Sequence, residues 1–182
     1  LLGDDPQSAS LLFDTFATRG IAVGAADEGL FWSDVLPLGG PLPGGVIRTG
    51  GRYGGPIVNV VQHLTSPAGV ALDERHGRIY WTDLGDAANP SAVFTANRDG
   101  TEVQRIISGP SLSEIAGIAV DARHDKLYFT YVNPLLDSLF AGGIARADLE
   151  GASRYGRDAG ICVRAGERGD TGARLRDGSG AA

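Results

Sequence analysis

Residues 69–83 read GVALDERHGRIYWTD, and this stretch decides the fold because the chain contains it three times. The other copies read GIAVGAADEGLFWSD, from Gly20 to Asp34, and GIAVDARHDKLYFTY, from Gly117 to Tyr131. The copies align without a gap, and their first residues are 49 and then 48 positions apart. A constant period of this length indicates a repeat architecture, in which each unit buries its apolar face against the next.

Each unit contains the pattern of four short strands. In the central copy, Gly69–Leu72 is a continuous apolar run, Asp73–Gly77 has turn chemistry, and Arg78–Asp83 alternates between two faces. Two further strands are predicted at Ala92–Ala96 and Glu102–Ile107, on either side of an Asn-Arg-Asp-Gly turn. Four antiparallel strands in 40–50 residues are typical of one blade of a β-propeller. We therefore predict an all-β fold.

Tyr80–Asp83 is an intact Tyr-Trp-Thr-Asp tetrapeptide, and it precedes an Asn-x-Asp-Gly turn. This order resembles the class B (YWTD) repeats of the low-density-lipoprotein-receptor family. The other copies carry weakened versions, Phe31–Asp34 and Tyr128–Tyr131. The resemblance implies a six-bladed propeller with an extracellular or cell-surface location, and it implies a structural role for Asp34 and Asp83. Because the aromatic pairs recur in every unit, they are interpreted as core residues.

The blade count is incomplete for a ring. We expect blades near residues 20–64, 69–109 and 117–151, an outer strand at 10–16, and a disordered Gly- and Arg-rich tail at 152–182. About three blades are half of a six-bladed propeller, and a ring needs at least about four. We expect Leu11–Phe16 to extend the edge of the third blade, and we expect the chain to self-associate or to contact other propeller blades.

Three connections after the repeated motif are long and contain Pro or Gly: Val35–Gly45, Leu84–Ser91 and Val132–Gly143. They follow the same strand of each blade, so we expect them to lie together on one rim, where binding loops of repeat proteins usually lie. The first hypothesis is therefore a non-catalytic module that binds a protein or carbohydrate partner. The candidate binding-loop residues are Leu36, Leu38, Asp86, Asn89, Asn133, Leu136 and Phe140.

Composition excludes several classes of partner. Residues 152–182 contain six Arg and four Asp or Glu, a net charge of +2, so the remainder of a chain with net charge −6 carries −8. An acidic body does not favour nucleic acid. No stretch approaches the ~18 apolar residues of a membrane helix. Cys162 is the single cysteine, so it forms no internal disulfide. Methionine is absent even from position 1, so we expect a processed or trimmed chain or a fragment.

No catalytic motif is present, and no cofactor or metal ligand set is predicted. The enzymatic alternative is a calcium-dependent lactonase or esterase of the six-bladed propeller class, which needs oxygen ligands where the innermost strands begin. Arg19-Gly20, Ala68-Gly69 and Ala116-Gly117 stand there, and Glu114 is the nearest acid. His76 and His124 occupy the same hairpin position and are interpreted as turn residues. A third hypothesis is a structural subunit of a larger surface or extracellular assembly.

Overall fold

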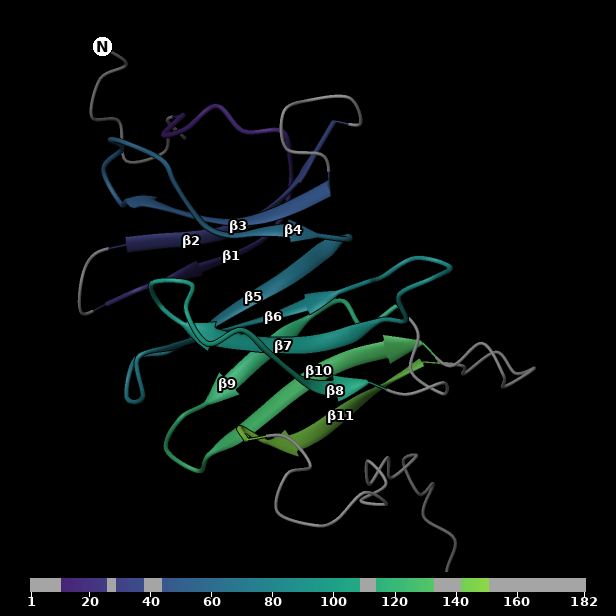
Figure 1. The fold of residues 1–182 in the computed structure, drawn as a ribbon. Helices are drawn as coiled ribbons and strands as arrows, with labels where there is room; N and C mark the ends of the chain where they lie inside the picture. Colours follow the sequence, from purple (N-terminus) through teal and green to yellow (C-terminus); the bar gives the residue numbers. More distant parts are fainter. Residues whose placement is uncertain (1–10, 26–28, 38–43, 109–113, 133–141, 151–182) are drawn as a thin grey trace, which may run out of the picture.

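The computed structural model of the chain describes residues 11–25, 29–37, 44–108, 114–132 and 142–150. These ranges form three antiparallel β-sheets that lie one below another in Figure 1, in the order of the sequence. The all-β prediction, with antiparallel four-stranded units, is confirmed. In the described part of the chain, no helix is long and apolar enough to cross a membrane.

Within each sheet the strands follow the order of the sequence. The first blade consists of β1 (Ala17–Val23), β2 (Gly29–Leu36), β3 (Gly44–Gly51) and β4 (Val58–Leu64). The second blade consists of β5 (Pro67–Asp73), β6 (Arg78–Asp83), β7 (Ala92–Asn97) and β8 (Gln104–Ser108). The third blade has three described strands, β9 (Ile118–Asp121), β10 (Lys126–Val132) and β11 (Gly142–Asp148).

Local sequence explains the hairpins. Asn97 and Gly100 close the turn between β7 and β8 with a 2.9 Å hydrogen bond from the Gly100 N–H to the Asn97 carbonyl. Gly100 has a φ of +84°, a left-handed conformation that glycine adopts without steric cost. In the strands of this blade, Trp81 pairs with Phe94, and their rings stack at 5.5 Å. The turn and the aromatic pair together fix the register of the sheet.

The hydrophobic core lies between the blades. Phe31, Ile47 and Val61 of the first blade pack against Val70 and Trp81 of the second, and all five are buried. A burial of this kind contributes about 1.5–3 kcal/mol for each large apolar side chain. The motif aromatics of the first two blades are therefore core residues, as their recurrence predicts.

The next layer of the core has the same construction. Tyr80 and Val93 of the second blade pack against Leu127, Phe129 and Ala145 of the third, and all five are buried. The second blade therefore packs one face of its sheet against the first blade and the other face against the third.

The segment Leu11–Phe16 differs from its expected form. It is not a strand, because the first strand begins at Ala17, and it lies against the first blade rather than at the edge of the third. The Phe13 ring stacks on the Trp32 ring at 5.1 Å. Aromatic packing therefore holds this segment against the first blade, which directly follows it in the sequence. The tail expected at 152–182, with Cys162, lies outside the described residues.

Candidate functional site

Three connections start from one edge of the molecule. β2, β6 and β10 are the second strands of their blades, and their last residues lie on the same side (the right side of Figure 1). The connections that follow them are residues 37–43, 84–91 and 133–141. We call this edge the loop rim. The β5–β6 and β9–β10 turns lie at the opposite edge, which we call the hairpin rim.

The connection 84–91 is folded by its own hydrogen bonds. The Oδ1 atom of Asp86 accepts the N–H groups of Ala88 and Asn89 at 2.8 and 2.7 Å, and the Asn89 side-chain amide at 3.1 Å. The backbone N–H of Asp86 donates to the Asn89 carbonyl at 2.8 Å. The hydrogen bonds from the Asn89 and Ala88 N–H groups lower the pKa of Asp86. The loop is thus ordered although residues 86–90 are exposed.

The motif aspartate of the second blade anchors the start of this loop. Buried Asp83 accepts the N–H groups of Thr65 and Ser66 at 3.0 and 2.8 Å, and that of Gly85 at 2.8 Å. Thr65 and Ser66 form the link between the first and second blades, so one carboxylate holds both the link and the loop. The structural role that the resemblance implies for Asp83 matches this geometry.

Buried Ser91 fixes the other end of the loop, and sequence reasoning missed it. Its hydroxyl donates to the Asp83 carbonyl at 3.0 Å and accepts the Ile115 N–H at 3.0 Å. Ile115 belongs to the segment that enters the third blade. No repeated motif marks Ser91, so only the three-dimensional arrangement identifies it.

Asp34 serves a different set of partners. It accepts the Arg48 guanidinium at 2.8 Å, the Trp32 indole N–H at 3.2 Å and the Thr18 hydroxyl at 2.5 Å. All three partners lie in the first blade, whereas Asp83 reaches across to the preceding link. The two motif aspartates are both structural, but only Asp83 ties two blades together.

A shallow hollow of about 530 Å³ opens at the loop rim, where the innermost strands begin. Arg19 donates to the Ser66 hydroxyl at 2.9 Å inside this hollow. Glu114, with a φ of +48°, lines it from the third blade. Among the described residues, no three His, Cys, Asp or Glu side chains form a group that could hold a metal ion.

The predicted binding-loop residues differ in their exposure and in whether the structure describes them. Leu36 is buried, because β2 continues to this residue and pairs it with Gly44. Asp86 and Asn89 are exposed on the loop rim, but their polar atoms hold the loop together. Leu38, Asn133, Leu136 and Phe140 lie outside the described residues.

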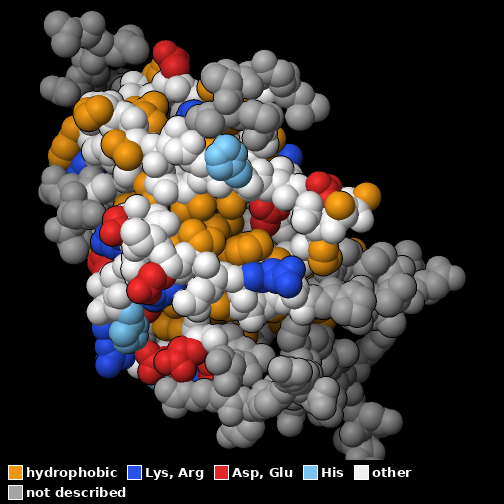
Figure 2. Space-filling view, viewed as in Figure 1, with side chains coloured by type: hydrophobic (Ala, Val, Ile, Leu, Met, Phe, Trp, Pro, Cys, Tyr) orange, Lys and Arg blue, Asp and Glu red, His pale blue; other side chains and the backbone are white. Residues whose placement is uncertain are grey.

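A second hollow, of about 720 Å³, lies between the second and third blades toward the hairpin rim. Charged and histidine side chains gather on this part of the surface, toward the lower left of Figure 2. Its lining includes His76, Arg78, Tyr80, His124 and Lys126. Burial raises the pKa of Tyr80, so its phenol is neutral at physiological pH.

Each hairpin turn beside this hollow carries an aspartate–histidine pair. The Nδ1 atom of His76 lies 2.6 Å from an oxygen of buried Asp73, and that of His124 lies 2.6 Å from an oxygen of Asp121. The same carboxylates accept backbone N–H groups of the turn, including the His76 N–H at 3.1 Å. The hydrogen bond from His124 lowers the pKa of Asp121. The histidines therefore help their aspartates to close the turns.

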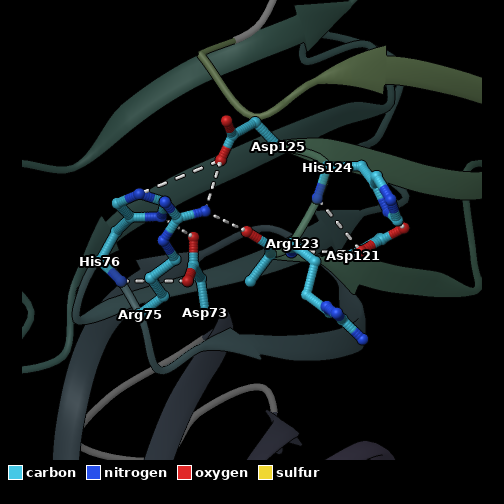
Figure 3. A network of polar contacts seen from close by, with 8 residues as sticks. Asp73, Arg75, His76, Asp121, Arg123, His124 and Asp125 are labelled. Atoms are coloured by element: carbon cyan, nitrogen blue, oxygen red, sulfur yellow. Dashed lines mark hydrogen bonds and ion pairs between the residues drawn. The ribbon is translucent and has the colours of Figure 1, made fainter.

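The two turns also contact each other (Figure 3). The guanidinium of Arg75 donates to the Ala122 carbonyl at 3.0 Å and lies 3.7 Å from Asp125. His76 approaches the same carboxylate through Nε2 at 4.0 Å, whereas His124 turns toward its own aspartate. These contacts are exposed, and exposed ion pairs each contribute about 0–1 kcal/mol. We interpret the network as a seam between blades.

The hollow at the hairpin rim is lined by two cations, Arg78 and Lys126, and by three carboxylates, Asp125, Asp148 and Glu150. Arg78 donates to Thr95 and Asn97 and lies 3.6 Å from Glu102, and Lys126 pairs with Asp148. Because charges of both signs line it, this hollow has no strong preference for a ligand of one sign. The loop rim is therefore the better candidate for a binding surface.

No protein-family model matches the chain. Solved structures are similar to it in fold. A crystal structure of a nidogen/laminin complex superposes with a TM-score of 0.61 at 24% identity, over 74% of this chain and 45% of that chain. A putative TolB from Agrobacterium tumefaciens gives a TM-score of 0.61 at 11% identity, over 77% of this chain and 48% of that chain.

A gluconolactonase from Xanthomonas campestris gives a TM-score of 0.60 at 18% identity, over 82% of this chain and 51% of that chain. The chain spans about half the length of each of these three structures. Together with the three stacked sheets, these similarities establish a partial β-propeller fold.

Proposed function

We propose that this chain is a non-catalytic binding module, related to the YWTD propellers, that presents its loop rim to a protein partner. One observation carries the proposal: the connections after β2, β6 and β10 all start at one edge, beside an open hollow. Loops on a rigid repeat scaffold are the usual place for recognition. The sheets provide the rigid part through their buried inter-blade cores.

The described loop of this rim suits recognition because it is ordered before any partner binds. Asp86 supplies three hydrogen bonds within the loop, and Asp83 and Ser91 fix its two ends. Ordering a side chain or loop on binding costs about 0.5–1.5 kcal/mol for each immobilised side chain. A loop that is already folded avoids much of that cost.

A structural neighbour supports a protein partner. The nidogen/laminin structure is a complex of two proteins, and it shares the fold of this chain at 24% identity. The hollow beside the loops combines Arg19 and Glu114 with the apolar Leu84 and with Tyr131. Mixed polar and apolar lining with an aromatic residue is typical of protein interfaces. A carbohydrate partner and a cell-surface location rest on the family resemblance alone and stay predictions.

The test removes the loops without disturbing the sheets. β2 and β3 pair Leu36 with Gly44, and β10 and β11 pair Val132 with Gly142, so residues 37–43 and 133–141 can each be replaced by Asn-Gly. A displayed peptide library is selected on the parent chain. We expect the selected peptides to lose binding to the trimmed variant and to keep it with Arg123→Ala, a change on the hairpin rim. Equal binding to the trimmed variant would overturn the proposal.

The second candidate is a hydrolase, favoured by the similarity to a gluconolactonase. Calcium takes about 6–8 oxygen ligands. The described lining of the rim hollow offers one carboxylate, Glu114, with the Arg19 guanidinium in the same hollow. These residues do not fit such a cation. Turnover of gluconolactone that is lost with a chelator and with Glu114→Gln would establish the hydrolase and displace the binding module.

A further inference from the structure

A hydroxyl at the third position of the aromatic motif joins each blade to the next. Ser33 accepts the Gly20 N–H at 3.0 Å and donates to the Ala68 carbonyl of the second blade at 2.5 Å. Thr82 repeats the contact: it accepts the Gly69 N–H at 2.8 Å and donates to the Ala116 carbonyl at 2.6 Å. The hydrogen bond therefore runs in one direction, from each blade to the following one.

Glycine is required at the point where the innermost strands meet. A Cβ atom at Gly20 would lie 2.2 Å from the Ala68 carbonyl oxygen, and one at Gly69 would lie 2.4 Å from the Ala116 oxygen. No side chain fits at these distances. Hydroxyl and glycine together thus mark a blade face that receives the next blade.

The strand beside the motif adds an apolar contact. Ile47 pairs with Ser33, Val93 pairs with Thr82, and Ile144 pairs with Thr130, so the three apolar residues hold equivalent positions. Ile47 and Val93 are fully buried against the following blade, each at 0% exposure. Ile144 is 73% exposed. Among the described residues, nothing covers this apolar side chain of the third blade.

The remaining parts of this receiving face are also present on the third blade. Thr130 accepts the Gly117 N–H at 2.9 Å, as Thr82 does with Gly69, and it is exposed. Around Gly117, a Cβ atom would meet only the Thr130 side chain among described neighbours. The third blade thus has the hydroxyl, the glycine and the apolar residue of a receiving face, and no blade in the described part of the chain occupies it.

The opposite end of the stack carries the complementary face. On the second blade, Val70 packs in the core against Ile47 of the first. The equivalent of Val70 on the first blade is Ile21, which is 62% exposed, and Val23 on the same strand is also exposed. We call the surface formed by Ile21 and Val23 of β1 the docking face. It is apolar and exposed, as a surface that covers Ile144 of the third blade must be.

The segment Leu11–Phe16 sits where the outer strand of a preceding blade would sit. It covers Trp32 through Phe13, as β4 with Val61 covers Trp81 of the second blade. β4 is hydrogen-bonded to β3, whereas Leu11–Phe16 forms no strand pairing with the described residues. β11 is an edge strand of the described third blade. The segment and that edge are therefore complementary.

We propose that a second copy of this chain docks β1 and Leu11–Phe16 onto the open face of the third blade. Ile21 of one copy covers Ile144 of the other, the Arg19 carbonyl accepts the Thr130 hydroxyl, and Leu11–Phe16 adds to the edge of β11. The occupant follows from continuity with the two inter-blade interfaces already formed within the chain. Because each copy offers both faces, two copies close on each other as a ring. The proposal stands independently of the ligand of the loop rim.

Light scattering after size exclusion tests the proposal on the full chain. We expect a particle of twice the 18.9 kDa chain mass. Ile144→Glu and Ile21→Lys change exposed side chains, so each variant keeps its blades and loses the dimer. Val103→Glu, an exposed apolar residue beside β8, is the matched control and keeps the dimer.

Mixing the two variants makes the test specific for these faces. In a mixed dimer, the glutamate introduced in one copy faces the lysine introduced in the other, and the second contact keeps both isoleucines. We expect the mixture of the two monomeric variants to recover the dimer. A cooperatively unfolding monomer of the parent chain, an open polymer, a dimeric Ile144→Glu variant or a mixture that stays monomeric would each overturn the proposal.

Discussion

Asp83→Asn tests the carboxylate that joins the first blade to the second. Oδ1 of Asp83 accepts the Ser66 and Gly85 N–H groups, and Oδ2 accepts the Thr65 N–H. An asparagine keeps one oxygen for the first two donors and presents an NH₂ group to the third. The substitution therefore removes the negative charge at a buried site and places the asparagine NH₂ group against the Thr65 N–H, so that two hydrogen-bond donors face each other.

The magnitude follows from these three bonds. Losing one hydrogen bond to a charged group costs about 1.5–3 kcal/mol, and turning the other two into neutral bonds adds about 1 kcal/mol. We expect a loss of about 3 kcal/mol in the free energy of unfolding, a large part of the ~5–15 kcal/mol of a typical domain. For a chain of this size, that corresponds to a fall of about 6–12 °C in Tm.

Urea unfolding followed by tryptophan fluorescence measures the change, because buried Trp81 lies in the interface that Asp83 secures. Asp86→Asn is the control, since it changes an exposed carboxylate outside β6 and leaves the link between blades intact. A loss below about 1 kcal/mol for Asp83→Asn would refute the reasoning, because it would mean that the link N–H groups do not depend on the charge.

Two further predictions concern the blade contacts and the hairpin turns. In the monomeric Ile144→Glu background, Gly69→Ala should destabilise the chain by about 1–3 kcal/mol or more in urea unfolding, because the new Cβ would meet the Ala116 oxygen at 2.4 Å. Gly117→Ala is the control and should destabilise the chain less, because a Cβ there makes no such backbone contact among the described residues. Equal losses of stability in the two variants would contradict the prediction. The hydrogen bond from His124 lowers the pKa of Asp121 in the folded chain. This hydrogen bond therefore contributes its full stabilisation above the unfolded-state pKa of about 4, and the stabilisation is lost as the pH falls through the lower folded-state pKa. Carboxyl NMR titration should show that His124→Ala raises this pKa toward its ordinary value, and an unchanged titration would contradict the assignment.

The sequence predicts the fold well because the repeat is local. Constant spacing, a turn and an aromatic pair each follow from contacts within one unit, and the four-stranded sheets of the first two blades confirm the architecture. The sequence is less informative about Leu11–Phe16. Its spacing from Gly20 suggests a strand, but a strand needs a partner edge, and the contact that forms is the stacking of Phe13 on Trp32.

The candidate site is harder to predict than the fold. The sequence places Leu36 on a loop, but pairing with Gly44 extends β2 through it and buries it. Ser91 links two distant backbone groups, and no sequence spacing shows such a contact. The Asp-x-x-His spacing, which recurs at Asp73 and Asp121, does contain a usable signal: it marks the turns in which a histidine binds its own aspartate.

The hydroxyl hydrogen bond runs from one blade to the following blade, so the two faces of a blade are not equivalent. A unit that carries Ser33 with Gly20, or Thr82 with Gly69, can be followed only by a unit that offers a backbone carbonyl in the right place. Duplication of one whole unit therefore preserves the hydroxyl-to-carbonyl hydrogen bond at each new junction between blades. Gene duplication can lengthen such a chain without inventing a new interface, and an engineer can insert a blade at the link that Asp83 secures by the same rule.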